Sequence, residues 1–311
     1  MKLGIVVVYL VRPENEQLLD LHLHKLQSMT HVPYAIYAGI RELPPALLAR
    51  LESEPQLEIF PLPETDLQMS AEHSFYLEQL IEHALADRVT HVVCMHVDSF
   101  PIRPDWAETI ATELEQGKAL ATLAQGGFLI QYSACLFFGR DFWEQQRPRL
   151  LLSEADLASA EYERFACAFP HHGEDSGAGY AFAAFAAGKE IALLDGAAAP
   201  ASAGKYGGVY GDRIFHLAGA YRYEKMSEAE RAATNRAALR IFAGARRRLK
   251  RYLPAPLRRR TRQVSERLHE TWERTHYDQA RSELLRDPER YLERARRDSR
   301  RSSPQTTVTE P

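Results

Sequence analysis

The sequence predicts an α/β protein in which a mostly parallel sheet is flanked by helices and followed by an Arg-rich helical extension. Apolar β-branched runs alternate with amphipathic segments over about 220 residues, and this alternation is typical of such sheets. From Met226 on, the chain is rich in arginine and has no strand-like run. The chain has 311 residues, 45% of them hydrophobic, so it can bury a substantial core.

The first half of the chain carries the clearest alternation. Residues 2–11 (KLGIVVVYLV) form a continuous β-branched run, the pattern of a strand that is buried on both faces. We expect the following elements after it: a helix over 14–29, a strand over 33–38, a helix over 44–52, a strand over 57–61, a helix over 70–87 and a strand over 90–97.

The second half is predicted to continue the alternation and then to lose it. We expect a helix over 105–117, an extended segment over 119–122, a strand-like run over 128–139 with a turn near Gln131, helices over 141–146 and 154–165, an Ala-rich helix over 176–188, a strand over 189–194 and a Gly-rich loop over 203–211. This organisation predicts a main domain over 1–225, a basic helical extension over 226–298 and a disordered tail over 299–311.

Charge is distributed unevenly along the chain. Residues 236–301 contain 21 Lys or Arg against 9 Asp or Glu, whereas residues 1–235 contain 18 against 32. The basic extension therefore permits two interpretations: an interfacial helix held against anionic lipid, or an Arg-rich helix packed on the acidic body. Nucleic acid is not an expected partner, because no aromatic RNA platform or zinc motif is present.

Several protein classes are excluded by composition. No stretch reaches the roughly 18 apolar residues that a membrane crossing needs, and the N-terminus lacks the pattern of a signal peptide. The three cysteines are widely spaced, which indicates neither a disulfide framework nor a zinc cluster. We expect a cytoplasmic protein, with peripheral attachment at the inner face of the membrane through the basic extension as an open alternative.

The segment over 92–106 (VVCMHVDSFPIRPDW) contains the first candidate site residues. A buried strand brings His96 and Asp98 to its carboxyl end, where open α/β sheets bind their ligands. Alternation along the strand puts both side chains on one face, where a carboxylate and an imidazole can share a divalent cation with phosphate oxygens. The alternative is a structural histidine and a capping aspartate before a turn.

Two later segments carry further candidates. Glu174 and Asp175 are adjacent acids before the Ala-rich helix, where they suit either helix capping or general-base catalysis. Lys205 and Arg213 lie in and after the Gly-rich loop, whose backbone can approach phosphates while the two cations neutralise a diphosphate; a flexible connection is the alternative. His216 follows this loop, and its alternative is a half-buried strand histidine.

Taken together, these segments resemble the GT-A fold glycosyltransferases, especially the broad family 2 group. In that group a strand ends in Asp-x-Asp, followed shortly by Pro and often by a Trp-containing helix. Here His96 stands at the first Asp position, and Asp98 stands at the second, which usually contacts the metal. The resemblance spans residues 1–225 and leaves the extension unexplained.

The resemblance implies a role for each candidate. Asp98, with His96 and His216, would hold a divalent cation, Mn²⁺ or Mg²⁺, and Asp175 beside Glu174 would deprotonate an acceptor hydroxyl. By chain order, the nucleotide-binding positions correspond to Val8, Tyr9, Arg12 and His73, with Lys205 and Arg213 near the diphosphate.

The implied activity is that of a hexosyltransferase-type enzyme. It would move a sugar from a nucleotide-diphospho-sugar donor to a saccharide or lipid-linked acceptor hydroxyl, with inversion, in the synthesis of cell-envelope polysaccharide or glycolipid. One alternative is a non-catalytic sugar- or nucleotide-binding protein, because His96 departs from the motif. Another is a sugar nucleotidyltransferase, although residues 12–15 (RPEN) lack the Gly-rich basic loop of that class.

Overall fold

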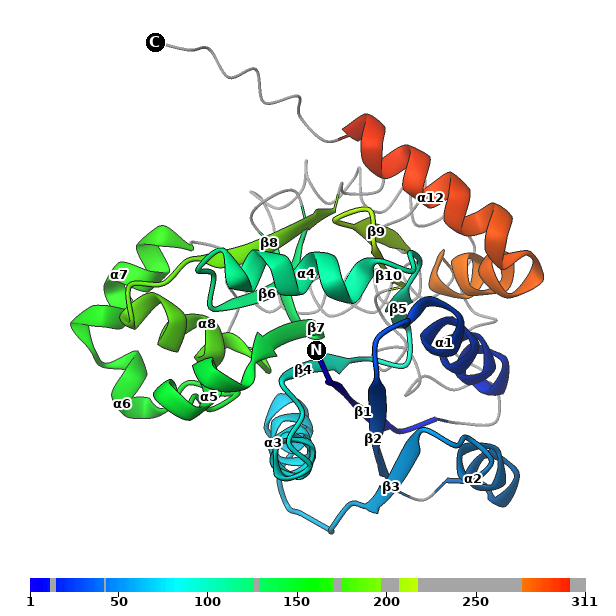
Figure 1. The fold of residues 1–311 in the computed structure, drawn as a ribbon, viewed down its shortest axis with the longest axis horizontal. Helices are drawn as coiled ribbons and strands as arrows, with labels where there is room; N and C mark the ends of the chain where they lie inside the picture. The colour runs from blue at the N-terminus through cyan, green and yellow to red at the C-terminus, as the bar shows by residue number, and fades with distance from the viewer. Residues whose placement is uncertain are drawn as a thin grey trace, which may run out of the picture.

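The computed structural model describes residues 1–11, 15–41, 43–125, 129–169, 175–196, 207–217 and 276–302. Its strands are β1 (Leu3–Tyr9), β2 (Tyr34–Ile40), β3 (Leu57–Pro61), β4 (His91–Met95), β5 (Ser99–Pro101), β6 (Leu120–Gln125), β7 (Leu129–Gly139), β8 (Ile191–Gly196), β9 (Gly208–Tyr210) and β10 (Ile214–His216). Its helices are α1 (Glu16–Met29), α2 (Pro45–Glu52), α3 (Ser70–Ala86), α4 (Trp106–Glu115), α5 (Arg140–Gln146), α6 (Glu154–Leu157), α7 (Ala160–Ala168), α8 (Ala178–Ala186) and α12 (Pro288–Ser302), with one more over 276–286. Figure 1 shows these helices around a single sheet.

The predicted α/β class, with a sheet flanked by helices and a helical C-terminal extension, is confirmed. The strand order is β3-β2-β1-β4-β7-β6-β8-β9-β10-β5. Strands β3, β2, β1 and β4 are parallel, but β7 runs antiparallel to both β4 and β6, so the sheet is mixed. The reversal follows from the short connection between β6 and β7, because parallel neighbours need a crossover of a dozen or more residues.

Strand β1 lies at the centre of the core. All seven of its residues are buried, as the continuous apolar run predicts. Ile5 and Val7 pack on one face of the sheet with residues of α1, α2 and α4, whereas Val6 packs on the other face with α3 and α8. Full burial of each such side chain stabilises the fold by roughly 1.5 to 3 kcal/mol. The carboxyl ends of β1 and β4 are therefore set on a rigid scaffold.

A small antiparallel unit, formed by β5, β9 and β10, lies next to this scaffold. Strand β10 pairs with β9 on one side and with β5 on the other, so that His216 is opposite Ser99. Leu217 N–H also donates a hydrogen bond of 2.9 Å to the carbonyl of Asp98. The region around the predicted Gly-rich loop therefore ends in a hairpin, since residues 208–210 pair as a strand.

The described part of the extension packs on the main body rather than standing apart. The helix over 276–286 and α12 lie against α1 and the β9–β10 hairpin (Figure 1). Helix α12 continues to Ser302, past residue 299 where the predicted tail begins, and Ser299 Oγ donates to the Val209 carbonyl at 2.9 Å. The basic cluster over 246–260 lies outside the described residues.

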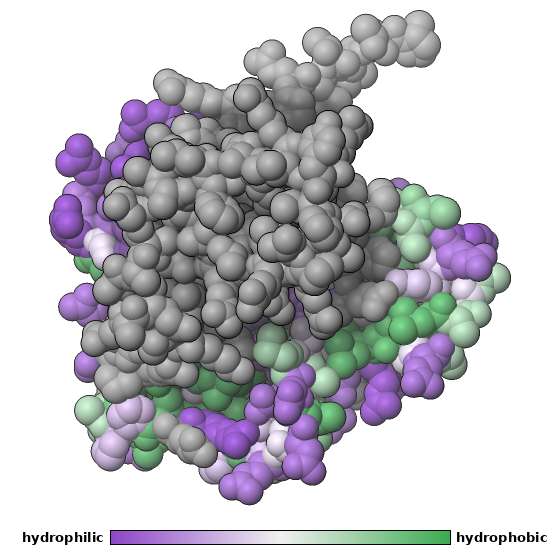
Figure 2. Space-filling view, turned by 180° about the vertical axis from the view of Figure 1, so that it is seen from behind, coloured by the Kyte–Doolittle hydropathy of each residue, from purple (hydrophilic) through white to green (hydrophobic). Residues whose placement is uncertain are grey.

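The surface mixes hydrophilic and hydrophobic side chains. Figure 2 shows hydrophobic residues, drawn green, among hydrophilic ones on the face behind that of Figure 1. Among the described residues, the large hydrophobic side chains that are exposed are Met1, Leu67, Met69, Phe75 and Leu157. None of the described helices combines the length and the apolarity needed to cross a bilayer.

Candidate active site

Three of the predicted metal-binding side chains meet at the carboxyl end of β4. His96 and Asp98 follow this strand, and His216 ends β10. His216 Nε2 lies 3.6 Å from Asp98 Oδ1, and His96 Nδ1 lies 3.9 Å from the same oxygen. One potential ligand atom from each residue lies within 4.8 Å of the other two, a spacing that a single ion can bridge.

His96 is oriented by a second contact. Its Nε2 lies 3.0 Å from Ser133 Oγ on β7, so a neutral His96 that donates from Nε2 keeps an unprotonated Nδ1 toward Asp98. Metal-ligating histidines commonly donate their other ring N–H in this way. Desolvation lowers the pKa of His96 to about 4, against the opposing effect of Asp98, so the imidazole is neutral at pH 7 and able to bind a cation.

The donor set favours a particular class of cation. The Asp98 side chain is 2% exposed and that of His216 is 8% exposed, while His96 at 34% opens the cluster to solvent. Two imidazole nitrogens beside one carboxylate suit divalent transition metals, whereas Mg²⁺ prefers oxygen ligands. The cluster therefore fits a divalent transition metal with room for ligands from outside the protein.

Asp175 lies just before α8 and is held by two hydrogen bonds. Ser70 Oγ and the Ser176 N–H both donate to Asp175 Oδ1, at 2.6 and 2.7 Å. The negative charge of Asp175 acts on both His73 and His96, raising their pKa values against the effect of burial. An exposed, oriented carboxylate thus lies near the cluster, as general-base catalysis requires.

His73 joins the cluster from the first turn of α3. Its ring centroid lies 5.3 Å from that of His96, at an interplanar angle of 65°. Burial, followed by the proximity of His96, lowers the pKa of His73 to about 3, so it is neutral near pH 7. Met69, immediately before α3, has a φ of 56°. This left-handed backbone conformation is unfavourable for any residue other than glycine, although less so for methionine than for a β-branched residue.

The other predicted site residues lie elsewhere. Val8 and Tyr9 are buried in the two core layers on either side of β1, and their assignment to a nucleotide-binding position by chain order stays a prediction. Arg213 immediately precedes β10, at the opposite end from His216, and its Nη2 pairs with Asp105 Oδ2 at 3.2 Å. The remaining predicted residues, Arg12, Glu174 and Lys205, lie outside the described residues.

Sequence reasoning missed the residues that orient the candidates. Ser133 is a polar residue within the apolar run of β7, and this interruption was a usable signal. Ser70 and Ser176 orient Asp175 from two separate helix starts, which no local pattern indicates. His22 Nδ1 lies 3.0 Å from the Ser99 carbonyl, next to Asp98. The sequence pattern of α1 indicated only a core-packing helix and gave no sign of this contact.

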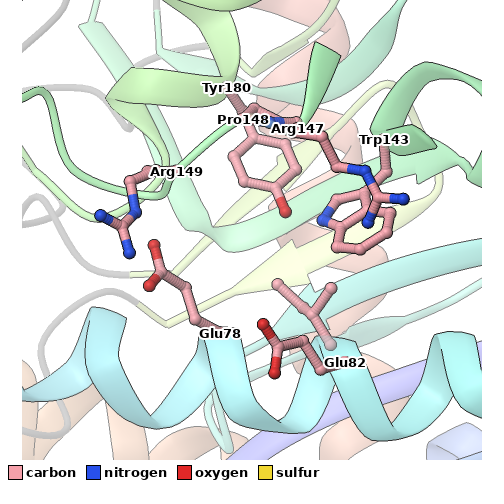
Figure 3. A pocket seen from close by; sticks show the side chains of 8 residues that line it. Glu78, Glu82, Trp143, Arg147, Pro148, Arg149 and Tyr180 are labelled. Carbon is pink, nitrogen blue, oxygen red and sulfur yellow. The ribbon is translucent and has the colours of Figure 1, made fainter. Parts of the chain in front are cut away.

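A separate cavity of about 210 Å³ lies between α3, α5 and α8. Figure 3 shows Glu78 and Glu82 on one side, with Trp143, Arg147, Arg149 and Tyr180 around them. The Arg147 guanidinium stacks on Trp143, with Cζ 4.0 Å from the ring centroid. No member of the His96, Asp98 and His216 cluster lines this cavity, so it is distinct from the candidate active site.

The solved structures to which the chain is similar include three of sugar-transfer proteins. A mannosyltransferase from Pyrobaculum calidifontis, in complex with GDP-Man and Mn²⁺, has 12% identity and a TM-score of 0.45, covering 96% of this chain and 85% of that one. A protein from Desulfovibrio desulfuricans G20, assigned as a nucleotide-diphospho-sugar transferase, has 11% identity and a TM-score of 0.37, covering 62% and 79%.

The third structure is the glycosyltransferase GlyE of Streptococcus pneumoniae TIGR4, with 12% identity and a TM-score of 0.35, covering 62% of this chain and 45% of that one. No protein-family model and no curated protein matches the chain. At these values the likeness concerns the general fold, and function has to be argued from the residues of this chain.

Proposed function

We propose that this chain is a metal-assisted glycosyltransferase that moves a sugar from a nucleotide-diphospho-sugar to an acceptor hydroxyl. The observation that carries the proposal is the distance of 3.6 Å between His216 Nε2 and Asp98 Oδ1. The resemblance to GT-A enzymes implies a histidine after the Gly-rich loop that completes the metal site. His216 ends β10, far along the sequence from β4, and its place after the loop supports the proposal.

Asp98, His96 and His216 would hold the cation. A bound divalent cation would supply charge neutralisation for the departing diphosphate. Asp175 accepts the acceptor's hydroxyl proton, and Ser70 and Ser176 fix the orientation of its carboxylate. The acceptor oxygen forms a bond to the anomeric carbon while the bond to the diphosphate oxygen breaks and its electron pair leaves with the diphosphate. A single displacement of this kind inverts the anomeric configuration.

The donor and acceptor classes belong to the same proposal. We take the donor to be a nucleotide-diphospho-hexose and the acceptor to be a saccharide or lipid-linked hydroxyl of the cell envelope. A soluble, peripherally attached enzyme would suit such an acceptor, with the Arg-rich segment 246–260 as the membrane contact.

Calorimetric titration with nucleotide sugars tests the donor site. UDP-, GDP-, CMP- and dTDP-linked sugars, GDP-mannose included, are titrated with and without Mn²⁺ into the native protein, Asp98→Asn and Asp141→Asn. Asp141 is an exposed carboxylate in the first turn of α5 and serves as the matched control. We expect metal-dependent binding of one donor, weakened at least about 100-fold by Asp98→Asn, because a lost metal ligand removes the cation. Equal binding by Asp98→Asn, or none by the folded native protein, would refute the proposal.

Slow hydrolysis of the donor separates an enzyme from a binding protein. Asp175→Asn should keep donor and Mn²⁺ binding but reduce turnover about 100-fold or more, because general-base catalysis contributes about 10² to 10⁴ in rate. Donor binding without turnover in the native protein would instead support the non-catalytic alternative.

A further inference from the structure

The β9–β10 hairpin has two faces with different roles. Along β10, Ile214 and His216 point to one face and Phe215 points to the other, because side chains alternate along a strand. Phe215 is fully buried and packs with Val209 and with apolar residues of the helices over 276–302. The face opposite His216 is thus covered by the C-terminal helix pair, which we define as the helix 276–286 together with α12.

Apolar and close contacts hold α12 on this face. Tyr291 meets Phe215 edge-on, with ring centroids 6.0 Å apart. It also lies directly over Gly207, where an added Cβ would come 2.5 Å from the Tyr291 hydroxyl. Gly207 N–H in turn donates to the Leu217 carbonyl at 3.0 Å, next to His216. Tyr291 therefore packs on Gly207, and Gly207 is hydrogen-bonded to Leu217, the residue that follows His216.

Charged contacts hold the hairpin turn. Arg296 forms a two-point pair with the Asp212 carboxylate, with Nη2 at 2.6 Å from Oδ2, and Arg300 adds a bond of 2.9 Å to the same oxygen. Such paired guanidinium contacts fix geometry as well as adding energy. Arg296 and Arg300 hold the pKa of Asp212 at about 2 through these bonds and their charge. The turn between β9 and β10 is thus tied to α12.

The same helix pair is anchored to the scaffold on its other side. Lys25 on α1 pairs with Glu289, and Arg281 donates to Asn15 Oδ1 at the start of α1. Leu18 and Leu21 of α1 belong to the same apolar cluster as the helix pair. The helix pair therefore bridges α1, which is packed on the sheet, and the hairpin that carries His216.

The hairpin needs this support because its strands are short. β9 and β10 have three residues each, and within the described part of the chain the rest of the sheet holds them only through the three-residue strand β5 and through one residue pair with β8, Gly196 and Tyr210. We infer that the C-terminal helix pair is a clamp that holds His216 beside Asp98, and that Asp212, Tyr291 and Arg296 are positioning residues for the metal site. The existence of the clamp rests only on these contacts. The identity of the ligand, a divalent metal, rests on the proposed function.

Two variants and one matched control test the clamp in the metal-free, full-length protein. Arg296→Gln removes the cation of the ion pair, on α12, and Asp212→Asn removes its carboxylate, in the hairpin turn. Asn tolerates the φ of 57° at position 212. Arg297→Gln is the control, because Arg297 is 60% exposed and pairs within α12 with Glu293. We expect amide hydrogen exchange over 207–217 to become about 3- to 10-fold faster in the two variants, in line with the loss of partly buried ion pairs, and to stay unchanged in the control. Equal exchange in all proteins would overturn the inference.

Mn²⁺ titration then asks whether the clamp acts on the metal site. Arg296→Gln and Asp212→Asn should raise the Mn²⁺ dissociation constant about 3- to 10-fold, in line with the loss of partly buried ion pairs, and Arg297→Gln should not. At saturating Mn²⁺, electron spin-echo spectra should show weaker coupling to a second imidazole nitrogen in the two variants, toward the spectrum of His216→Ala. Faster exchange with unchanged affinity and spectra would overturn the inference. A native protein that binds no Mn²⁺ would refute the metal role in the proposed function, while hydrogen exchange would still decide whether the clamp exists.

Discussion

The parallel half of the sheet and the small antiparallel unit are stabilised in different ways. Strands β1 and β2 have seven residues each, and β1 is wholly buried between helices that follow closely in the chain. Strands β5, β9 and β10 have three residues each and depend on contacts with the distant residues 276–302. His96 and Asp98 belong to the end of the rigid half, whereas His216 belongs to the dependent unit.

This difference separates fold stability from site assembly. Changes in the parallel half should lower the free energy of unfolding of the whole protein. Changes in the small unit should loosen His216 while most of the sheet stays folded, because proteins open locally where buried contacts are few. The unit is therefore the place where the candidate metal site can be altered without unfolding the scaffold.

The largest expected effect lies in the parallel half. Ile5→Ala should lower the free energy of unfolding by about 3 kcal/mol, because Ile5 is fully buried and its truncation leaves a cavity. Urea denaturation followed by circular dichroism measures the change. Leu157→Ala is the control, since Leu157 is 37% exposed and its truncation should change stability by less than about 1 kcal/mol. Similar losses in both variants would contradict the assignment of stability to the parallel half.

A matched truncation in the small unit should act mainly on the site. Phe215→Ala should lower the free energy of unfolding by about 2 kcal/mol, less than Ile5→Ala, because the unit can open by itself. Mn²⁺ affinity should fall at least about 10-fold in the same sample, since His216 is the next residue. The two regions would not differ as we describe if Phe215→Ala lost as much stability as Ile5→Ala and kept its Mn²⁺ affinity.

Two glycines with a positive φ isolate the contact between the hairpin and α12. Gly207 has a φ of 81° and faces Tyr291, whereas Gly188 has a φ of 66° and no atom within 4 Å of an added Cβ. Gly188→Ala should destabilise by about 1 kcal/mol from backbone strain alone, and Gly207→Ala by about 2 kcal/mol from strain and steric conflict. Thermal unfolding measures the loss of stability in each variant. Equal decreases in melting temperature would mean that Tyr291 moves away from the added methyl group at no cost in stability and would contradict a tight contact.

The smallest effect is a pH dependence of the hairpin turn. The pKa of Asp212 is about 2 in the folded protein, below the ordinary value of 3.8, because of Arg296 and Arg300. The contribution of Asp212 to stability is therefore fully present above about pH 4 and is lost as the pH falls toward 2. Since the group is partly exposed, we expect a difference of about 1 kcal/mol between the native protein and Asp212→Asn at pH 6. Urea unfolding at several pH values should show this difference shrinking below pH 4; a difference that stays constant would argue against the pair.

Local patterns were sufficient for the elements of the parallel half. The apolar run of β1, the amphipathic pattern of α3 and the boundaries of β3 follow from periodicity and turn residues. The position of His96 and Asp98 after a buried strand follows from the same signal. Strands β5, β9 and β10 could not be predicted in this way, because three residues are too few to show a period.

The sequence by itself determined the α/β class, the buried first strand and the presence of His96 and Asp98 at a strand end, because these depend on residues close together in the chain. Only the tertiary structure decided that β7 runs antiparallel, that His216 lies 3.6 Å from Asp98 and that α12 covers the hairpin. These features arise from contacts between distant segments, whose partners are selected by shape, burial and charge in the folded protein and leave no periodic mark in the sequence.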